Sequence, residues 1–224
     1  MPIIKKYDTD FFKIWSHDMA YVLGFMYADG NLVKTTRGTH FIAIYSADHE
    51  LLEQFKLLFK SEHSIHQRTT SSGKVSRIQI GSKEWFYDLQ RIGLTPGKAK
   101  IMTLPKIPDA YIGDFIRGYF DGDGNVWSGQ IHKNRQKQQK TLQVAFTSGS
   151  SGFLYDLHLL LSKKGVVGGS LYKSSKKNFS RLSFSLQAAL TIYKIMYNGD
   201  HKLYLPRKKQ VFEKFVNCGG SSTG

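Results

Sequence analysis

The apolar positions of residues 16–93 change period several times, and each change predicts a new element. An almost continuously apolar stretch from about Ser16 to Asp29 predicts a buried helix. After Asp48, a candidate N-cap, apolar residues at positions 51, 52, 55, 58 and 59 have helical spacing. Phe41 and Ile42 break the alternation of one predicted strand, so the sequence leaves its register open. The remaining elements are strands Asn31–Thr36, Thr39–Ser46, His63–Thr70 and Lys74–Ile80 and a helix, Lys83–Ile92, that Gly93 ends.

The second half of the chain repeats this plan. Asp29 matches Asp123 at an offset of 94 residues, and two strand segments then match at offsets of 102 and 104, namely Ile42–Ser46 with Val144–Ser148 and Ser76–Ile80 with Ser180–Phe184. The offset grows where the second copy inserts the polar segment Ile131–Lys140. Three collinear matches indicate a duplicated αββαββα unit, an α+β layer. We expect an N-terminal unit with linker at residues 1–107 and a C-terminal unit with a basic tail, helical toward its end within 201–215, at residues 108–224.

Each copy opens on an apolar segment that closes on Asp-Gly, at Val22–Gly30 and Ile116–Gly124. Small residues recur every fourth position and would form one stripe on each helix. Glycine inside a helix costs about 1 kcal/mol relative to alanine, so such a stripe indicates close helix packing. The predicted interface residues are Gly24, Ala28, Gly118 and Gly122. Gly30 and Gly124 fit the left-handed position after a helix.

Asp29 and Asp123 would then stand at two helix C-termini, where the helix dipole already places negative charge. If the helices pack in parallel, the two carboxylates converge, and a divalent cation is the simplest group to lie between them. Taken singly, each segment could equally be a buried helix with an ordinary Asp-Gly turn. Because both segments end in this way, the pair favours a cation-binding site over two ordinary turns.

With these two segments, the sequence resembles the LAGLIDADG family of homing endonucleases and maturases, in its single-chain, two-motif form. The resemblance covers residues ~14 to ~215 and implies two units related by a pseudo-twofold axis, with both sheets forming a saddle over DNA. It implies catalytic and Mg²⁺-binding roles for Asp29 and Asp123, with Ala28 and Gly122 beside the metal. Mn²⁺ should substitute, and Ca²⁺ should support binding without cleavage.

The resemblance also implies a basic residue near the end of each unit that polarises water or steadies the phosphate. Lys98 matches that place in the first unit. In the second unit Lys202 or Lys208 could serve, and a lysine that contacts only backbone phosphate is an equal alternative. The earlier motif acid is present as Asp121 but is Tyr27 in the first copy, a departure that we do not interpret as inactivation.

Composition agrees with a nucleic-acid partner. The 224 residues carry a formal net charge of +15, and a chain this basic most often binds a polyanion. No apolar run reaches the ~20 residues of a membrane span, and a secretion signal is not evident at the start. Cys218 is the only cysteine, which excludes an internal disulfide. We expect an intracellular monomer that binds double-stranded DNA and no membrane.

Polar residues of the predicted sheets are candidates for that DNA contact, because Lys and Arg neutralise phosphates and Arg, Asn and Gln pair with base edges. The alternative is that they simply cover the solvent side of a sheet. The hairpin at 131–140 favours a partner, since a two-stranded ribbon fits the major groove. The candidates are Lys34, Arg37, Gln67, Arg68, Lys74, Arg77, Lys133, Asn134, Arg135, Gln136, Lys137, Lys140, Lys173, Lys176, Lys177 and Arg181.

Other chemistry fits less well. Asp121–Asn125 opens like a calcium loop, but Val126 replaces the turn glycine. Inteins carry similar motifs, but the chain starts at Met-Pro and lacks a terminal His-Asn splice junction. We therefore expect a free-standing protein that functions in intron homing. The leading hypothesis is a site-specific endonuclease that makes a double-strand break at a long DNA site by metal-dependent hydrolysis. The alternatives are an RNA maturase that binds intron RNA and a non-cleaving DNA-binding derivative.

Overall fold

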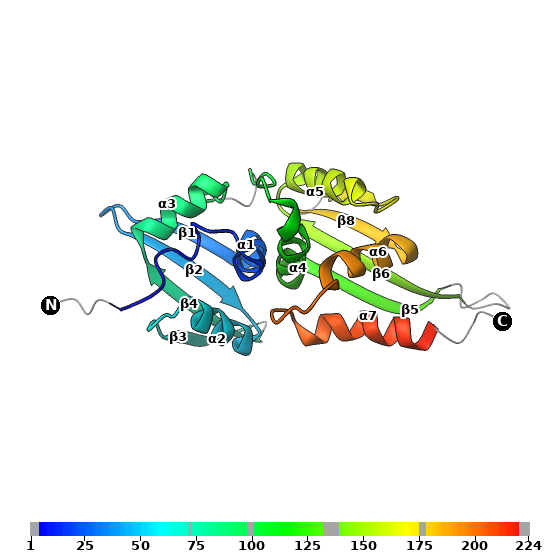
Figure 1. Cartoon of the computed structure of the whole chain (residues 1–224), viewed down its shortest axis with the longest axis horizontal. Helices are drawn as coiled ribbons and strands as arrows, with labels where there is room; N and C mark the ends of the chain where they lie inside the picture. Colours follow the sequence, from blue (N-terminus) through cyan, green and yellow to red (C-terminus); the bar gives the residue numbers. More distant parts are fainter. Residues whose placement is uncertain (1–4, 72, 98–100, 132–138, 175–177, 220–224) are drawn as a thin grey trace.

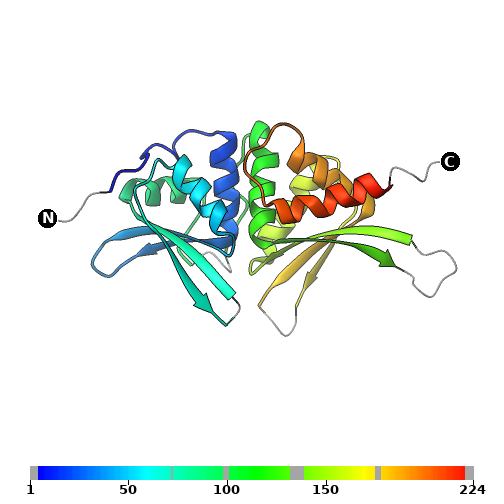
Figure 2. The same cartoon turned by 90° about the horizontal axis from the view of Figure 1, so that it is seen from below.

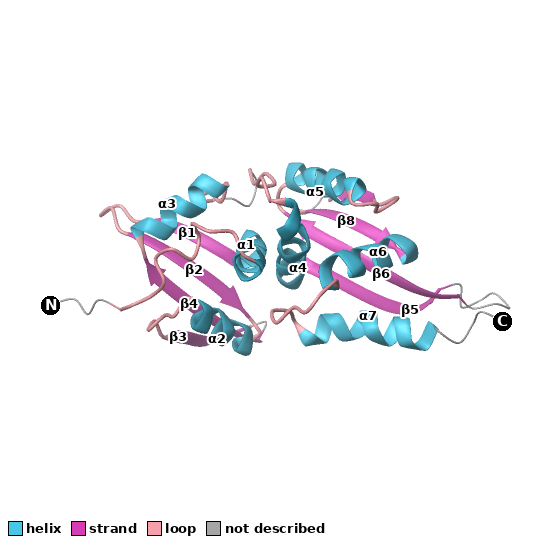
Figure 3. Ribbon diagram, in the orientation of Figure 1, coloured by secondary structure: helices cyan, strands magenta, loops and turns pink. Residues whose placement is uncertain are grey.

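The chain folds into two units of the same plan, each a four-stranded sheet with helices on one face (Figures 1 and 3). The computed structural model describes residues 5–71, 73–97, 101–131, 139–174 and 178–219. The first unit consists of α1 (His17–Asp29), β1 (Gly30–Lys34), β2 (His40–Ser46), α2 (His49–Leu58), β3 (Ile65–Thr70), β4 (Gly73–Gly81) and α3 (Lys83–Ile92).

The second unit repeats this order and is followed by one more helix. It consists of η2 (Asp109–Tyr111), α4 (Ile112–Asp123), β5 (Gly124–Ile131), β6 (Gln139–Ser148), α5 (Ser151–Lys163), β7 (Ser170–Lys173), β8 (Ser180–Ser185) and α6 (Leu186–Tyr197). The additional helix, α7 (Pro206–Gly219), packs against β5. The first described residues and the C-terminal end of α7 lie on opposite sides of the molecule (Figure 1).

The two sheets have the same antiparallel topology, β1-β2-β4-β3 and β5-β6-β8-β7. In the central strands β2 and β6, alternate residues such as Ile42, Ile44, Val144 and Phe146 are buried under the helices. The intervening residues point to the other face of each sheet, because side chains alternate along a strand. Figure 2 shows the helices on one side and both sheets splaying away from them on the other. We call the two sheet faces turned away from the helices the open faces.

The helices α1 and α4 lie side by side at the centre of the molecule (Figure 1). Residues Met19–Tyr27 of α1 are all buried, which accounts for a helix that is apolar on every side. Ser16 begins it, because its hydroxyl accepts a bond of 3.1 Å from the amide of Met19. One apolar cluster runs through both units. None of the described helices is both long and apolar enough to cross a membrane.

The predicted architecture, two tandem αββαββα units, is confirmed. The division expected at residue 107 falls between α3 and η2. One local prediction differs. Asp48 occupies the N-cap position of α2 but makes no capping bond; its carboxylate accepts instead from Arg207, at 2.9 and 3.3 Å. The basic stretch 201–215 is helical toward its end, as predicted: α7 begins at Pro206, and residues 201–205 are non-helical and bond to α4 through Leu203 and Leu205.

Candidate active site

The paired helices α1 and α4 end at Asp29 and Asp123. Each aspartate is the last residue of its helix and is exposed. Neither helix has a basic residue in its last turn. Each carboxylate therefore adds negative charge at the negative end of a helix dipole, an arrangement that favours a nearby cation.

The glycines after the two aspartates differ from the prediction. Gly30 and Gly124 both have φ −91°, which is extended backbone and not the left-handed conformation. Glycine is needed here for space. A Cβ on Gly30 would lie 2.7 Å from the carbonyl oxygen of Met26, and one on Gly124 would lie 2.7 Å from the Cα of Phe120. The chain turns so tightly across each helix end that a side chain would collide with the preceding turn.

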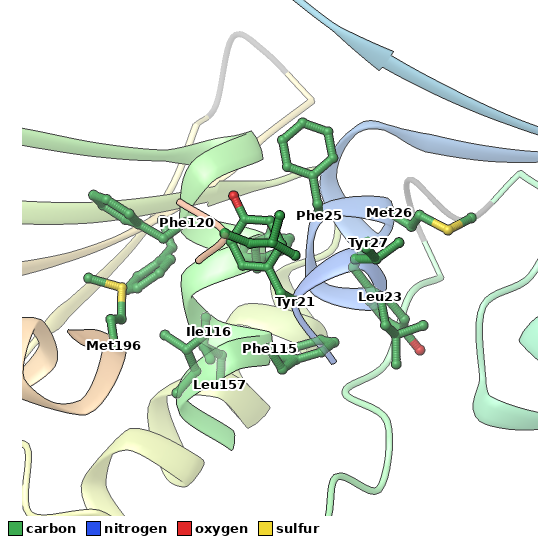
Figure 4. Packing of buried hydrophobic residues seen from close by; sticks show 14 of the residues in the cluster. Tyr21, Leu23, Phe25, Met26, Tyr27, Phe115, Ile116, Phe120, Leu157 and Met196 are labelled. Atoms are coloured by element: carbon green, nitrogen blue, oxygen red, sulfur yellow. The ribbon is translucent and has the colours of Figure 1, made fainter. Parts of the chain in front are cut away.

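Glycines bring the two helices into backbone contact. A Cβ on Gly24 would overlap the carbonyl of Phe115 and lie 2.9 Å from the amide nitrogen of Tyr119. A Cβ on Gly118 would overlap the carbonyl of Tyr21 and lie 2.9 Å from the amide nitrogen of Phe25. These contacts are reciprocal at the offset of 94 residues, as a pseudo-twofold axis between the helices requires. Figure 4 shows the large apolar side chains packed around this pair.

The same packing continues to the helix ends and brings the carboxylates together. A Cβ on Gly122 would overlap the methyl group of Ala28 and lie 3.4 Å from Oδ2 of Asp29. The structure thus places all four predicted interface residues between the helices. It also places the Asp29 carboxylate beside the last turn of α4, the helix that carries Asp123.

One buried phenol lies close to both aspartates. Tyr119 donates its hydroxyl to the carbonyl of Thr147 at 2.6 Å. Burial raises the pKa of Tyr119 well above its usual value, and the negative charges of Asp123 and of Asp29 raise it further. The charges of both carboxylates therefore act in the same direction on the pKa of Tyr119.

A buried lysine from α7 completes this neighbourhood. Nζ of Lys208 donates to the carbonyls of Phe120, Asp121 and Gly124 at 2.7, 2.8 and 2.7 Å. The Phe120 carbonyl also accepts from the Gly124 amide. The ammonium adds a donor at the last carbonyls of α4 and so caps this helix. Burial lowers the pKa of Lys208 to about 8, while the charges of Asp121, Asp123 and Asp29 act in the opposite direction.

The structure separates the two lysines between which the sequence left the choice open. Lys208 lies at the end of α4 that carries Asp123. Lys202 is exposed and follows His201, whose ring lies 3.3 Å from Asp114 in the first turn of α4. Lys202 therefore lies near the opposite end of that helix. Lys98 lies outside the described residues, and its role stays a prediction.

The earlier motif acid, Asp121, is buried between the two units and the segment that leads into α7. Its Oδ2 accepts from the hydroxyl of Tyr21 at 2.6 Å and from the amide of Leu205 at 2.9 Å. Burial raises the pKa of its carboxyl group. This carboxyl therefore holds other parts of the chain, and its counterpart in the first copy, Tyr27, is buried as well.

Strand register decides which predicted DNA-contacting residues share the open faces. Arg68, Arg77 and Arg181 lie there, Arg77 paired with Tyr45 and Arg181 with Thr147. A shift of one residue moves a side chain to the other face. Five candidates belong by register to the helix-covered side: Lys34, Gln67, Lys74, Lys140 and Lys173.

Two of these five have described contacts on the helix side. The amide of Gln67 donates to the buried Ser76 hydroxyl, and Nζ of Lys140 lies over the ring of Phe215 in α7. Of the predicted DNA-contacting residues, the three arginines therefore lie on the open faces, whereas these five lie on the helix-covered side. Arg37 lies exposed in the β1–β2 turn. Lys133, Asn134, Arg135, Gln136, Lys137, Lys176 and Lys177 lie outside the described residues.

The open faces also carry residues that the sequence analysis missed. The first unit has Tyr45, His66 and Gln79 there, and the second has Trp127, Gln143 and Tyr172. Tyr45, His66, Arg68 and Arg77 line a hollow of about 330 Å³ on the open face of the first unit. Strict alternation from the buried Ile44, Ile78 and Val144 would have found Tyr45, Gln79 and Gln143. His66, Trp127 and Tyr172 lie on the neighbouring strands, whose faces follow only from the strand pairing.

The sequence profile of the LAGLIDADG-like domain family matches residues 16–92 and 110–196. These two stretches coincide with the two αββαββα units and together span more than half of the chain. The chain belongs to the LAGLIDADG family. Helix α7, which carries Lys208, lies outside both matched stretches of this family member.

Solved structures of LAGLIDADG proteins have the same fold. I-SmaMI bound to an uncleaved DNA target with calcium ions superposes with a TM-score of 0.61 at 14% identity, over 91% of this chain and 90% of that chain. I-SmaMI bound to cleaved DNA gives 0.60 at 15% identity, over 91% and 88%. Mesophilic variants of the homing endonuclease I-DmoI give 0.58 at 14% identity, over 81% and 95%.

Two curated relatives are much longer proteins. The probable translation initiation factor IF-2 of Thermococcus kodakarensis is 30% identical over 166 residues, which is 69% of this chain and 12% of that protein. An A-type ATP synthase subunit from Methanopyrus kandleri is 26% identical over 150 residues, 66% of this chain and 13% of that protein. The LAGLIDADG chain thus spans about an eighth of the curated relatives that it matches.

The helix ends fit a hard divalent cation. Among the described residues, no group of three or more His, Cys, Asp and Glu side chains could hold a metal. Mg²⁺ needs no such group, because it is commonly bound by one or two carboxylates together with water and substrate phosphates. Asp29 and Asp123 supply two carboxylates at one exposed place. Ala28 and Gly122 could contribute only backbone oxygens, and their part in metal binding stays a prediction.

Proposed function

We propose that this protein is a site-specific endonuclease that makes a double-strand break in DNA, with Asp29 serving one strand and Asp123 the other. One observation carries the proposal. Two exposed carboxylates stand at the adjacent ends of two helices in backbone contact, related by a pseudo-twofold axis. Duplex DNA has the same symmetry, because its two backbones are antiparallel.

The open faces would bind the duplex. They extend to both sides of the paired helices and carry Arg77 and Arg181 at matching places. The formal net charge of +15 favours association with a polyanion. Family neighbours support a DNA partner, since I-SmaMI is seen with uncleaved and with cleaved DNA. Because both halves are joined in one chain, a monomer would suffice.

Hydrolysis of a phosphodiester requires a held water molecule and neutralised charge. Asp29 and Asp123 would hold Mg²⁺ or Mn²⁺, which supplies charge neutralisation at the phosphate and the leaving oxygen. Lys208 would fix the end of α4 and so the position of Asp123. Ca²⁺ should hold the DNA without cutting, because its coordination is looser. I-SmaMI with calcium and uncleaved DNA is consistent with this expectation.

The test is cleavage of a randomised duplex library by the purified chain with Mg²⁺, followed by sequencing of the cut ends. We expect one family of related sites, cut on both strands at a fixed stagger, and no cutting with Ca²⁺. Binding of one site without cutting in Mg²⁺ or Mn²⁺ would contradict the nuclease and leave a DNA-binding protein. Cutting at random sequences would contradict site specificity.

A further inference from the structure

A tryptophan side chain lies on the open face of the second unit. Trp127 in β5 pairs with Gln143 in β6, whereas the neighbouring pair, Val126 and Val144, points to the helices. The side chain of Trp127 keeps 45% of its surface exposed. No function described so far uses this indole.

A glycine holds the indole against the strand. Gly129 is two residues further along β5 and therefore on the same face. A Cβ on Gly129 would lie 2.8 Å from Cη2 and 3.1 Å from Cε2 of Trp127, and would overlap Cζ2. The six-membered ring therefore lies over bare backbone. Glycine weakens a strand interior, so its presence needs a reason such as this close approach.

The matching place in the first unit is different. At the offset of 94 residues Trp127 corresponds to Val33, which pairs with Phe41 as Trp127 pairs with Gln143. Val33 is also exposed, at 37%, but is a small side chain. Gly129 corresponds to Thr35. At this place the second unit thus carries a large indole and the first unit a small valine, and the indole is on the same face as Arg181.

We propose that Trp127 is a specificity-determining residue that packs against the 5-methyl group of a thymine in the half-site bound by the second unit. This inference rests on the proposed function, which places the open faces in the major groove. Thymine is the only standard base that presents a methyl group there. The ring face has no hydrogen-bond donor or acceptor to pair with the edges of the other bases, but an apolar surface gains from covering a methyl group.

The expected effect is small and specific to one position. Covering one methyl group is worth about 0.8 kcal/mol, which corresponds to about a fourfold change in Kd. Uracil pairs as thymine does and lacks only this methyl group. Replacing the contacted thymine by uracil should therefore weaken binding about fourfold, and replacing any other thymine of that half-site should not.

The experiment uses the full chain, with Ca²⁺, and the duplex that it prefers from a random library. Each thymine of the second half-site is changed to uracil in turn, and Kd is measured by fluorescence anisotropy for wild type, Trp127→Ala and Trp127→Phe. Val33→Ala is the matched control in the first unit. Since Trp127 is exposed, the variants should fold, which circular dichroism checks.

We expect one position where wild type and Val33→Ala show the fourfold loss and Trp127→Ala shows none, with Trp127→Phe between them. An equal thymine-to-uracil ratio in wild type and Trp127→Ala at every position would overturn the proposal, as would a preferred half-site without thymine. In both cases the duplex is still bound in Ca²⁺ and should still be cut in a separate assay with Mg²⁺, so the endonuclease stands. Failure to prefer any duplex would overturn both.

Discussion

Replacing Gly118 by alanine tests whether the two motif helices pack through their backbones. The added Cβ would lie 2.8 Å from the carbonyl carbon of Tyr21 and 2.9 Å from the amide nitrogen of Phe25, besides overlapping the Tyr21 oxygen. Carbon contacts are optimal near 3.5–4.0 Å, so these atoms would be roughly 0.6–1.2 Å too close. Both neighbours are backbone of a buried helix and cannot rotate away. The helices must move apart.

Overpacking of this kind typically costs 1–3 kcal/mol, and alanine would recover about 1 kcal/mol through its higher helix propensity. Because backbone cannot yield as side chains do, we expect a net loss of about 1–3 kcal/mol in the free energy of unfolding. For a chain of this size that lowers Tm by roughly 2–12 °C. The shift would also separate Asp123 from Asp29 and reduce cleavage.

Gly152→Ala is the matched control, because Gly152 lies in α5 and its Cβ would meet only the Ser150 hydroxyl, at 3.8 Å. It should leave stability unchanged or raise it by up to about 1 kcal/mol. Denaturant titration of both variants and a cleavage assay provide the measurements. A Gly118→Ala protein as stable and as active as wild type would refute backbone contact between α1 and α4.

Three further predictions follow from described contacts. Lys208→Met should lower stability by about 1–3 kcal/mol at pH 7, because the buried carbonyls of Phe120 and Asp121 and the partly buried carbonyl of Gly124 each lose the lysine donor. The folded chain releases the Lys208 proton near pH 8, whereas the unfolded chain retains it to higher pH, so the free energy of unfolding of wild type should rise relative to that of the variant above pH 8. A falling difference in a pH series of denaturant titrations would contradict the lowered pKa. A double-mutant cycle of Arg207→Ala and Asp48→Ala should give a coupling of about 0.2–1 kcal/mol, since this pair between the units is partly exposed, and a coupling of zero would show that it contributes nothing. Arg77→Ala should flatten the slope of log Kd against log salt by about one unit, whereas Lys140→Ala, on the helix side, should leave it unchanged; equal slopes for the two variants would refute the register argument.

The sequence predicted the parts of this fold that depend on local pattern. The repeated Asp-Gly segments and the offset of 94 residues are sufficient for the duplicated plan, and small residues at every fourth position are sufficient for the helix pair. Gly24 and Gly118 could be found in this way because close backbone packing requires glycine whatever surrounds it. The position of Asp29 and Asp123 at the helix ends followed from the same pattern.

Features that depend on tertiary packing were less accessible. The apolar neighbours Phe41 and Ile42 concealed the strand register, and with it the face on which each polar residue lies. Lys208 could not be chosen over Lys202 from the sequence, because the choice depends on how residues 201–205 fold back along α4. The extended backbone at Gly30 also escaped prediction, since helix ends favour glycine for more than one reason.

Cleavage of the preferred duplex by Asp29→Asn and Asp123→Asn tests the central claim most directly. Each substitution removes one carboxylate charge and keeps the shape of the side chain, and Asp109→Asn, an exposed acid beyond the other end of α4, is the matched control. With the two strands labelled separately, the account predicts that both variants lose the double-strand product while Kd in Ca²⁺ stays near wild type, and that the control cuts normally. Normal cutting of both strands by either Asp29→Asn or Asp123→Asn would contradict it.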